Sequence, residues 1–133
     1  MLANPLEEND YKLINPISYL AEWKWDGIRV QLVSMKNEVK LYSRSGDDIS
    51  NSFPDIIENS FSQDFCLDGE LMAGSIEIPG SFNDLQQRLN RKNPSKDLIR
   101  NMPTFIVAYD ALYIKGQDIS CLLYTSDAAD DPA

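Results

Sequence analysis

A lysine followed by an Asp-Gly turn and an arginine is the feature of this sequence that points most directly to chemistry. Residues 22–29 read Glu-Trp-Lys-Trp-Asp-Gly-Ile-Arg. A lysine amine, with a usual pKa of about 10.4, must lose a proton before it can attack phosphorus. A nearby cation such as Arg29 favours the neutral amine, and Gly27 permits a tight turn and close approach of a ligand. The segment suits a Lys24 that carries a nucleotide covalently, although a plain hairpin with a surface lysine fits it too.

Two carboxylates flank a glycine in the run Leu67-Asp68-Gly69-Glu70-Leu71. In a strand, Asp68 and Glu70 share one face because side chains alternate between the two faces. Paired carboxylates can hold Mg²⁺ or accept hydrogen bonds from sugar hydroxyls, and a glycine between them leaves room for a ligand. A strand with a solvated acidic face explains the pattern equally well.

Two further segments carry groups that suit a nucleotide or a nucleic acid. Residues 43–46 read Ser-Arg-Ser-Gly, and an arginine with hydroxyls beside a glycine suits contacts to phosphate. The polar end of a hairpin is the simpler interpretation of that segment. Residues 105–110 read Phe-Ile-Val-Ala-Tyr-Asp, and Tyr109 could stack on a purine base if it lines a cleft. Taken alone, such a tyrosine is more often part of a core.

Alternating and continuous apolar patterns predict five strands to position these groups. The predicted strands span residues 19–25, 28–34, 38–44, 65–73 and 104–114. Residues 104–114 are nearly continuous in apolar side chains, so we expect this strand to be central in its sheet. Residues 115–118 read as a turn. We see no internal repeat and no linker, so the chain is expected to form one unit.

Helical spacing of apolar residues predicts helices over residues 52–61, from Ser81 onward, and around 98–99. Ser81 and Asp84 form a capping-box pattern at the start of the second helix. Its apolar stripe is Phe82, Leu85 and Leu89. This stripe predicts that the basic side chains that follow, Arg88, Arg91 and Lys92, face solvent.

Composition excludes several classes of function. The 133 residues contain no histidine and two cysteines, so neither a Ser-His-Asp triad nor a Cys/His zinc site can form within the chain. No apolar run approaches the ~20 residues of a membrane span, and the N-terminus lacks the pattern of a signal peptide, so we expect a cytoplasmic protein without membrane contact. The net charge of −9 argues against DNA binding by overall charge, but residues 88–100 are locally basic.

The four segments, in this order, resemble the nucleotidyltransferase (adenylation) domain of ATP-dependent DNA ligases of bacterial type. The resemblance rests on Lys24 to Arg29, Ser43 to Gly46, Asp68 to Glu70, and Phe105 to Asp110. It implies an α+β fold, a partial ATP-grasp-like domain with antiparallel sheets flanked by helices, over residues 1–120. The family's later lysine-containing strand and OB-fold domain are not recognised here. Residues 121–133 resemble a non-native or disordered tail, so no role is expected there.

The resemblance also implies roles for individual residues. Lys24 would be the catalytic nucleophile that takes AMP from ATP, with Mg²⁺ offsetting phosphate charge and Glu70 helping to hold the metal. The cofactor-binding residues implied are Glu22, Trp23, Lys24, Arg29, Glu70 and Tyr109. The DNA-binding residues implied are Ser43, Arg44, Arg88, Arg91 and Lys92.

The implied function is sealing of nicks in duplex DNA during repair, recombination and replication, by a protein that acts as a monomer. The 133 residues alone are expected to adenylate slowly or not at all, and not to seal nicks. Three alternatives stay open. They are an RNA ligase or capping-type nucleotidyltransferase, a non-catalytic fragment that binds nucleotide or DNA, and a structural domain in which the four segments are coincidental.

Overall fold

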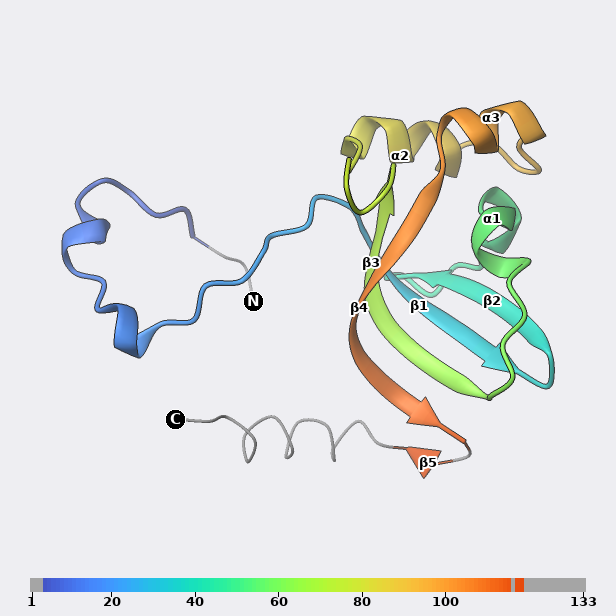
Figure 1. The fold of residues 1–133 in the computed structure, drawn as a ribbon, viewed down its shortest axis with the longest axis horizontal. Coiled ribbons are helices and arrows are strands. Elements are labelled where there is room, and N and C mark those ends of the chain that lie inside the picture. Colours follow the sequence, from blue (N-terminus) through green and yellow to red (C-terminus); the bar gives the residue numbers. More distant parts are fainter. Residues whose placement is uncertain (1–3, 116, 119–133) are drawn as a thin grey trace.

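The computed structural model describes residues 4–115 and 117–118. Its centre is an antiparallel five-stranded sheet in the order β2-β1-β3-β4-β5 (Figure 1). The strands are β1 (Ile28–Met35), β2 (Glu38–Ser43), β3 (Phe65–Ala73), β4 (Thr104–Ile114) and β5 (Gln117–Asp118). The predicted strands at 28–34, 38–44 and 65–73 are thereby confirmed. No helix in the described part of the chain is long and apolar enough to cross a membrane.

The β1–β2 hairpin turns at Lys36 and Asn37, whose φ angles are +50° and +66°. Two successive positive φ angles are those of a type I′ turn, which matches the twist of the flanking strands. The pairing runs from Met35 opposite Glu38 to Val30 opposite Ser43. The turn therefore fixes the register that brings the end of β2 beside the start of β1.

The helices are η3 (Ser50–Ser52), α1 (Pro54–Ile57), α2 (Phe82–Leu89) and α3 (Lys96–Asn101). The prediction of one helix over 52–61 is wrong in extent. Pro54 lacks an N–H and disfavours helical geometry at the residue before it, so Phe53, at φ −132° and ψ 59°, separates η3 from α1. At the other end, the Asn59 side-chain amide donates to the carbonyls of Asp55 and Ile56, which ends the helix.

The capping box at the start of α2 is confirmed. Ser81 Oγ accepts from the Asp84 N–H at 3.2 Å, and the Asp84 carboxylate accepts from the Ser81 N–H at 3.0 Å. These hydrogen bonds hold the Asp84 pKa below its usual range. The predicted short helix around 98–99 is α3, capped by Ser95, whose Oγ accepts from the Leu98 N–H.

One face of the sheet is closed by helices and the other is open. The closed side is a core of buried apolar residues drawn from three strands, α1, the residue before α1, and α2. Its members are Val30, Leu32, Leu41, Phe53, Ile56, Leu71, Ala73 and Leu85. On β1 the alternate residues Arg29 and Gln31 are exposed while Val30 and Leu32 are buried. The polar side chains of β1 and β3 therefore share the open face.

Strand β4 has the predicted bounds but not the predicted position. Its only partner along residues 104–112, within the described chain, is β3, because β5 pairs with Tyr113 and Ile114 alone. None of its side chains is fully buried, and residues 108–110 are exposed. The expected turn at 115–118 is also wrong in extent, since Lys115 turns the chain with φ +53° and residues 117–118 form β5.

The prediction of a strand at residues 19–25 is wrong. Residues 19–26 have no regular structure and follow two short 3-10 helices, η1 (Asp10–Lys12) and η2 (Pro16–Ser18). Figure 1 shows this segment, in blue, leading away from the sheet. Pairing with β3 begins only at Ile28, opposite Leu71. A strand needs a hydrogen-bonded neighbour, and these residues have none within the described part of the chain.

Candidate functional site

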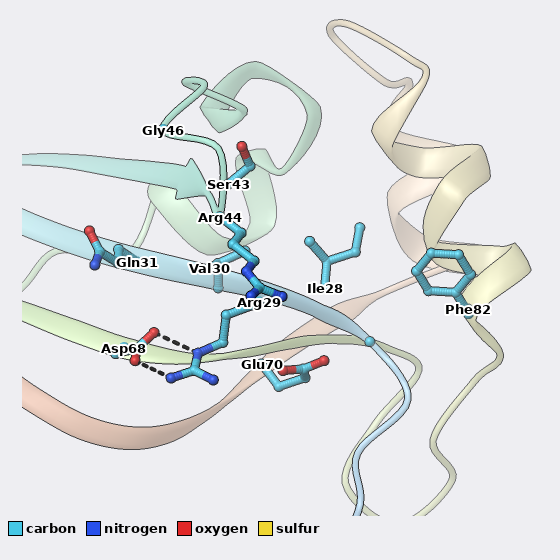
Figure 2. A pocket seen from close by; sticks show the side chains of 11 residues that line it. Ile28, Arg29, Val30, Gln31, Ser43, Arg44, Gly46, Asp68, Glu70 and Phe82 are labelled. Atoms are coloured by element: carbon cyan, nitrogen blue, oxygen red, sulfur yellow. Dashed lines mark hydrogen bonds and ion pairs between the residues drawn. The ribbon is translucent and has the colours of Figure 1, made fainter. Parts of the chain in front are cut away.

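An open cleft of about 920 Å³ lies over the open face, where β1, β3 and the end of β2 meet (Figure 2). The residues that line it come from three strands, the residue before β1, the turn after β2 and the start of α2. They are Gly27, Ile28, Arg29, Val30, Gln31, Ser43, Arg44, Gly46, Asp68, Glu70 and Phe82. Members of three of the four sequence segments thus meet in one cleft.

Strand register brings the charged groups of the cleft together. Arg29 lies opposite Glu70, and Gln31 lies opposite Asp68. From this position Arg29 donates from Nε to Asp68 Oδ1 at 2.8 Å, and Arg29 Nη2 pairs with Asp68 Oδ2. These hydrogen bonds raise the pKa of the Arg29 guanidinium above its ordinary value. The side chains of Arg29 and Asp68 are 48% and 17% exposed, so the pair is accessible to a ligand.

A β-bulge delivers Tyr109 to the same group. Asp68 pairs with Asp110 while Gly69 pairs with Ala108, so Tyr109 has no residue opposite it. Bulges redirect side chains and occur often beside active sites. The Tyr109 hydroxyl lies 3.3 Å from Glu70 Oε2, and the guanidinium carbon of Arg29 lies 5.0 Å from the centre of the Tyr109 ring. Partial burial, followed by the charge of Glu70, raises the pKa of Tyr109.

Gly69 is needed where β3 passes the bulge. A Cβ at this position would lie 2.5 Å from the Val107 carbonyl oxygen and 3.1 Å from Ala108 Cα. Any other residue would push β3 and β4 apart at the point where Tyr109 is inserted. The glycine between the two carboxylates therefore serves the strand contact itself, in addition to the space for a ligand that the sequence suggested.

The turn after β2 is stiffened by its own hydrogen bonds. Ser43 Oγ and Ser45 Oγ lie 2.9 Å apart, and Ser45 Oγ donates to Asp47 Oδ2 at 2.6 Å. Gly46 has φ +90°, a conformation that favours glycine. The turn presents the exposed Arg44 at the rim of the cleft, and Figure 2 shows it above Arg29.

Lys24 does not line this cleft. It lies in a neighbouring hollow of about 420 Å³ whose lining is mostly apolar. That lining consists of Trp23, Lys24, Trp25, Asp26, Met72, Ile76, Pro79 and Gly80. Glu22 and Trp23 are exposed. Gly27 lines the first cleft and separates it from this hollow. A Cβ at Gly27 would lie 2.1 Å from the Leu71 carbonyl oxygen, because the chain passes very close to β3 at this point.

The prediction that Arg88 faces solvent is wrong. Its side chain is fully buried and pairs with Asp55 at 2.5 Å. Arg88 Nη1 donates to the Met102 carbonyl at 2.6 Å, and Nη2 donates to the Ser52 carbonyl at 3.0 Å. Its guanidinium carbon also lies 5.3 Å from the centre of the Phe53 ring. Arg88 therefore ties α2 to η3, α1 and the end of α3, and it is not available to DNA in this structure.

Helix α2 ends before two of the three basic residues that the sequence placed on it. Helix α2 stops at Leu89, with Asn90 as its C-cap, so Arg91 and Lys92 lie in the following turn. Both side chains are exposed. They keep the solvent-facing position that the sequence predicted, on a loop rather than a helix.

Comparison with known proteins identifies the family. Residues 1–126 match the family model described as the ATP dependent DNA ligase domain. The chain belongs to this family. It is 38% identical over 119 residues to a probable DNA ligase from Koribacter versatilis, covering 88% of this chain and 21% of that protein. It is 31% identical over 131 residues to a DNA ligase from Caldivirga maquilingensis, covering 92% of this chain and 21% of that protein.

A solved structure supports the fold of this ligase-family chain. The mycobacterial DNA ligase D complexed with ATP and MES matches with a TM-score of 0.57 and 27% identity, covering 81% of this chain and 36% of that one. The predicted α+β class with an antiparallel sheet is confirmed. The chain spans about a fifth of the length of the curated relatives cited above.

The ligase-family cleft offers few protein ligands for a metal. Among the described residues, no group of three Asp, Glu, Cys or His side chains is placed to hold an ion. Asp68 is paired with Arg29, which leaves the Glu70 carboxylate beside the Tyr109 hydroxyl. Mg²⁺ is commonly bound by one or two carboxylates together with substrate phosphates and water. The donor set therefore fits a metal that arrives with a nucleotide.

Sequence reasoning gave no role to Gln31 and Phe82, which line the cleft, and did not foresee that Asp68 pairs with Arg29. The alternation of β1, with Arg29 and Gln31 on the polar face, was a usable signal for Gln31. Asp68 and Arg29 are 39 positions apart in the chain and meet only because β1 pairs with β3. Local sequence patterns do not specify that register.

Proposed function

We propose that this chain forms part of the catalytic site of an ATP-dependent DNA ligase, which seals nicks in duplex DNA through a lysyl-AMP intermediate on Lys24. The observation that carries the proposal is the single cleft that joins Arg29, Glu70 and Arg44, with Lys24 in the neighbouring hollow. Membership of the ligase domain family supports the same reaction.

In the proposed first step, Lys24 Nζ in its neutral form attacks the α-phosphorus of ATP. A phosphorus–nitrogen bond forms, the bond to the bridging oxygen breaks, and pyrophosphate leaves. AMP then passes to the 5′-phosphate at a nick, and the 3′-hydroxyl attacks that phosphate and releases AMP. Lys24 is exposed and lines the smaller hollow beside the cleft, which leaves its amine accessible to the nucleotide.

The proposed nucleotide contacts are divided between the two hollows. Glu22 would accept from the adenine amino group, and Trp23 and Tyr109 would contact the base. Arg29 would bind the nucleotide phosphate, and Glu70 would accept from a ribose hydroxyl. The 3.3 Å contact between Tyr109 and Glu70 supports placing base and ribose side by side.

When a nucleotide is bound, Mg²⁺ would offset phosphate charge as the reaction proceeds. Glu70 is the residue of this chain that we propose to hold it. Because the Tyr109 hydroxyl donates to the same carboxylate, Tyr109 would fix the orientation of Glu70 for this purpose.

The proposed DNA contacts are Ser43 and Arg44 at the rim of the cleft, with Arg91 and Lys92 after α2. All four lie at least partly exposed, as phosphate contacts require. The buried Arg88 is withdrawn from this set. We also propose that the ligase is a cytoplasmic monomer, and that the 133 residues alone do not seal nicks.

The experiment that tests the proposal is labelling with α-³²P-ATP and Mg²⁺, followed by denaturing electrophoresis. The chain is compared with Lys24→Ala and with Lys36→Ala, a control lysine in the exposed β1–β2 turn. A label that survives in the control and vanishes in Lys24→Ala supports the proposal. Bound ATP without label would instead favour a non-catalytic binding role.

A chimera extends the test to the complete reaction. Residues 4–115 replace the matching segment of the Koribacter versatilis ligase, with and without Lys24→Ala, and a nicked duplex is supplied. Sealing that depends on Lys24 is expected with ATP and nicked DNA. Preference for GTP or nicked RNA would point to a capping-type enzyme or an RNA ligase.

A further inference from the structure

The ion pair between Arg29 and Asp68 has two opposite interpretations. Asp68 could compete with an anionic ligand for Arg29, in which case the pair must break on binding. Alternatively, Asp68 could hold Arg29 in the orientation that binds the ligand, in which case the pair persists. The position of each guanidinium N–H group distinguishes these interpretations.

Asp68 occupies only one edge of the guanidinium. An arginine has five N–H donors, arranged so that two different edges can each bind an oxyanion side-on. Asp68 accepts from Nε at 2.8 Å and from Nη2. Both N–H groups of Nη1 and the second N–H of Nη2 are left for another partner. Figure 2 shows Nη1 on the side of Arg29 that points away from Asp68.

The remaining contacts of Arg29 restrain it further in the same orientation. Its guanidinium carbon lies 5.0 Å from the centre of the Tyr109 ring, and the Tyr109 hydroxyl contacts Glu70. The Asp68 side chain is only 17% exposed, so neighbouring atoms leave its carboxylate fewer orientations than a surface carboxylate has. Arg29, which is 48% exposed, would otherwise sample many rotamers in open solvent.

We propose that Asp68 is a positioning residue for nucleotide binding. It fixes the Nε edge of Arg29 so that the Nη1–Nη2 edge faces a phosphate of ATP in the cleft. This inference rests on the proposed function, because it takes ATP as the ligand. It reverses the expectation from charge alone, since removing a carboxylate beside an anion site should otherwise strengthen anion binding.

The first test measures ATP affinity by calorimetry in a Lys24→Ala background, where no covalent transfer follows binding. We expect Asp68→Ala to weaken ATP binding on the order of tenfold, as loss of a group that orients a ligand-binding residue does. Asp68→Glu, which keeps the carboxylate, should recover part of the affinity. The matched control is Glu38→Ala, which removes the 3.4 Å surface pair with Lys40 at the far end of the hairpin, and should leave binding unchanged.

The second test observes Arg29 directly. In a ¹⁵N NMR spectrum of the arginine side chains, assigned with Arg29→Lys, the Arg29 Nε–H signal should be protected from exchange in the unliganded protein. It should persist when ATP is added and lose its protection in Asp68→Ala. Loss of protection on adding ATP would show that the pair breaks, and would overturn the inference.

The two tests separate the possible failures. Absence of ATP binding with Asp68 intact would refute the proposed function, and this inference with it. ATP binding that is unchanged or stronger in Asp68→Ala would refute the positioning role alone. An Arg29 signal that is unprotected without ligand would likewise refute the positioning role, whatever the affinity for ATP.

Discussion

The described part of the chain contains two Arg–Asp pairs that share their chemistry and differ in burial. Arg88 and Asp55 meet under the helices, where the Arg88 side chain is fully buried. Arg29 and Asp68 meet on the open face, where the Arg29 side chain is 48% exposed. The buried arginine donates from both Nη atoms to Asp55 and to the Met102 and Ser52 carbonyls, while the exposed one keeps Nη1 free for a ligand. Burial, and not residue type, therefore separates the structural arginine from the one suited to a ligand.

The largest effect is expected from breaking the buried pair. Arg88→Met removes a charge partner of Asp55 and the donors to the Met102 and Ser52 carbonyls. Removing one member of a buried ion pair costs about 3–5 kcal/mol of stability. The free energy of unfolding, measured with urea, should fall by this amount. Arg91→Met, at an exposed position just beyond the same helix, should change it by no more than about 0.5 kcal/mol.

A second stability prediction concerns the sheet beneath the exposed pair. Gly69→Ala places a Cβ 2.5 Å from the Val107 carbonyl oxygen, so β3 and β4 must separate. Overpacking of this kind costs about 1–3 kcal/mol. Gly46→Ala is the contrasting variant, because no atom lies within 4 Å of its Cβ and only the backbone angle is strained. Thermal unfolding of the two variants would contradict the argument if Gly46→Ala were the more destabilised.

Breaking the exposed pair should affect binding rather than stability. Arg29→Ala is expected to change the free energy of unfolding by about 1 kcal/mol or less, the usual value for a solvent-accessible pair. Binding of ATP should nevertheless fall more than in Asp68→Ala, because the contact to phosphate is lost altogether. Urea unfolding measures the expected change in stability, and calorimetry on the same preparation measures the expected loss of ATP binding. A large loss of stability would mean that the two Arg–Asp pairs play the same structural role.

The smallest effect is a pH dependence on the open face. Burial and the charge of Glu70 raise the pKa of Tyr109, so the folded protein holds the phenolic proton more tightly than the unfolded chain does. This contribution to stability is complete below the ordinary tyrosine pKa, about 10, and is lost as pH rises through the folded-state value. A difference titration at 295 nm against Tyr109→Phe should show this tyrosine ionising late. Glu70→Gln should make it ionise earlier.

Local patterns in the sequence were sufficient for most of the sheet. The alternation in residues 28–44 predicted the hairpin, and Ser81 with Asp84 predicted the start of α2. The wrong predictions share a dependence on contacts distant in sequence. Residues 19–25 alternate like a strand but have no neighbouring strand in the described chain, and Arg88 looks like one of three surface cations although Asp55, 33 residues earlier, holds it inside.

The site was predictable in composition but not in arrangement. The types of Arg29, Glu70 and Arg44 were enough to suggest phosphate and sugar contacts, and these side chains share one cleft. The ion pair of Asp68 and the inserted Tyr109 depend on strand register, which the local pattern does not specify. Residues 119–133, including the predicted tail, lie outside the described part of the chain.

The bulge at Tyr109 is not the only irregularity in its strand. A second shift lies between Cys66 and Leu67, where Leu112 has no residue opposite it. Two single insertions make the path along β4 two residues longer than the path along β3, so the pair must arc, as Figure 1 shows. Because each inserted residue is itself unpaired, deleting one would restore one-to-one pairing at that point and keep the faces of the residues beyond it. Deleting both would remove the difference in length and straighten the arc. The curvature of the open face is therefore set by two single insertions in β4.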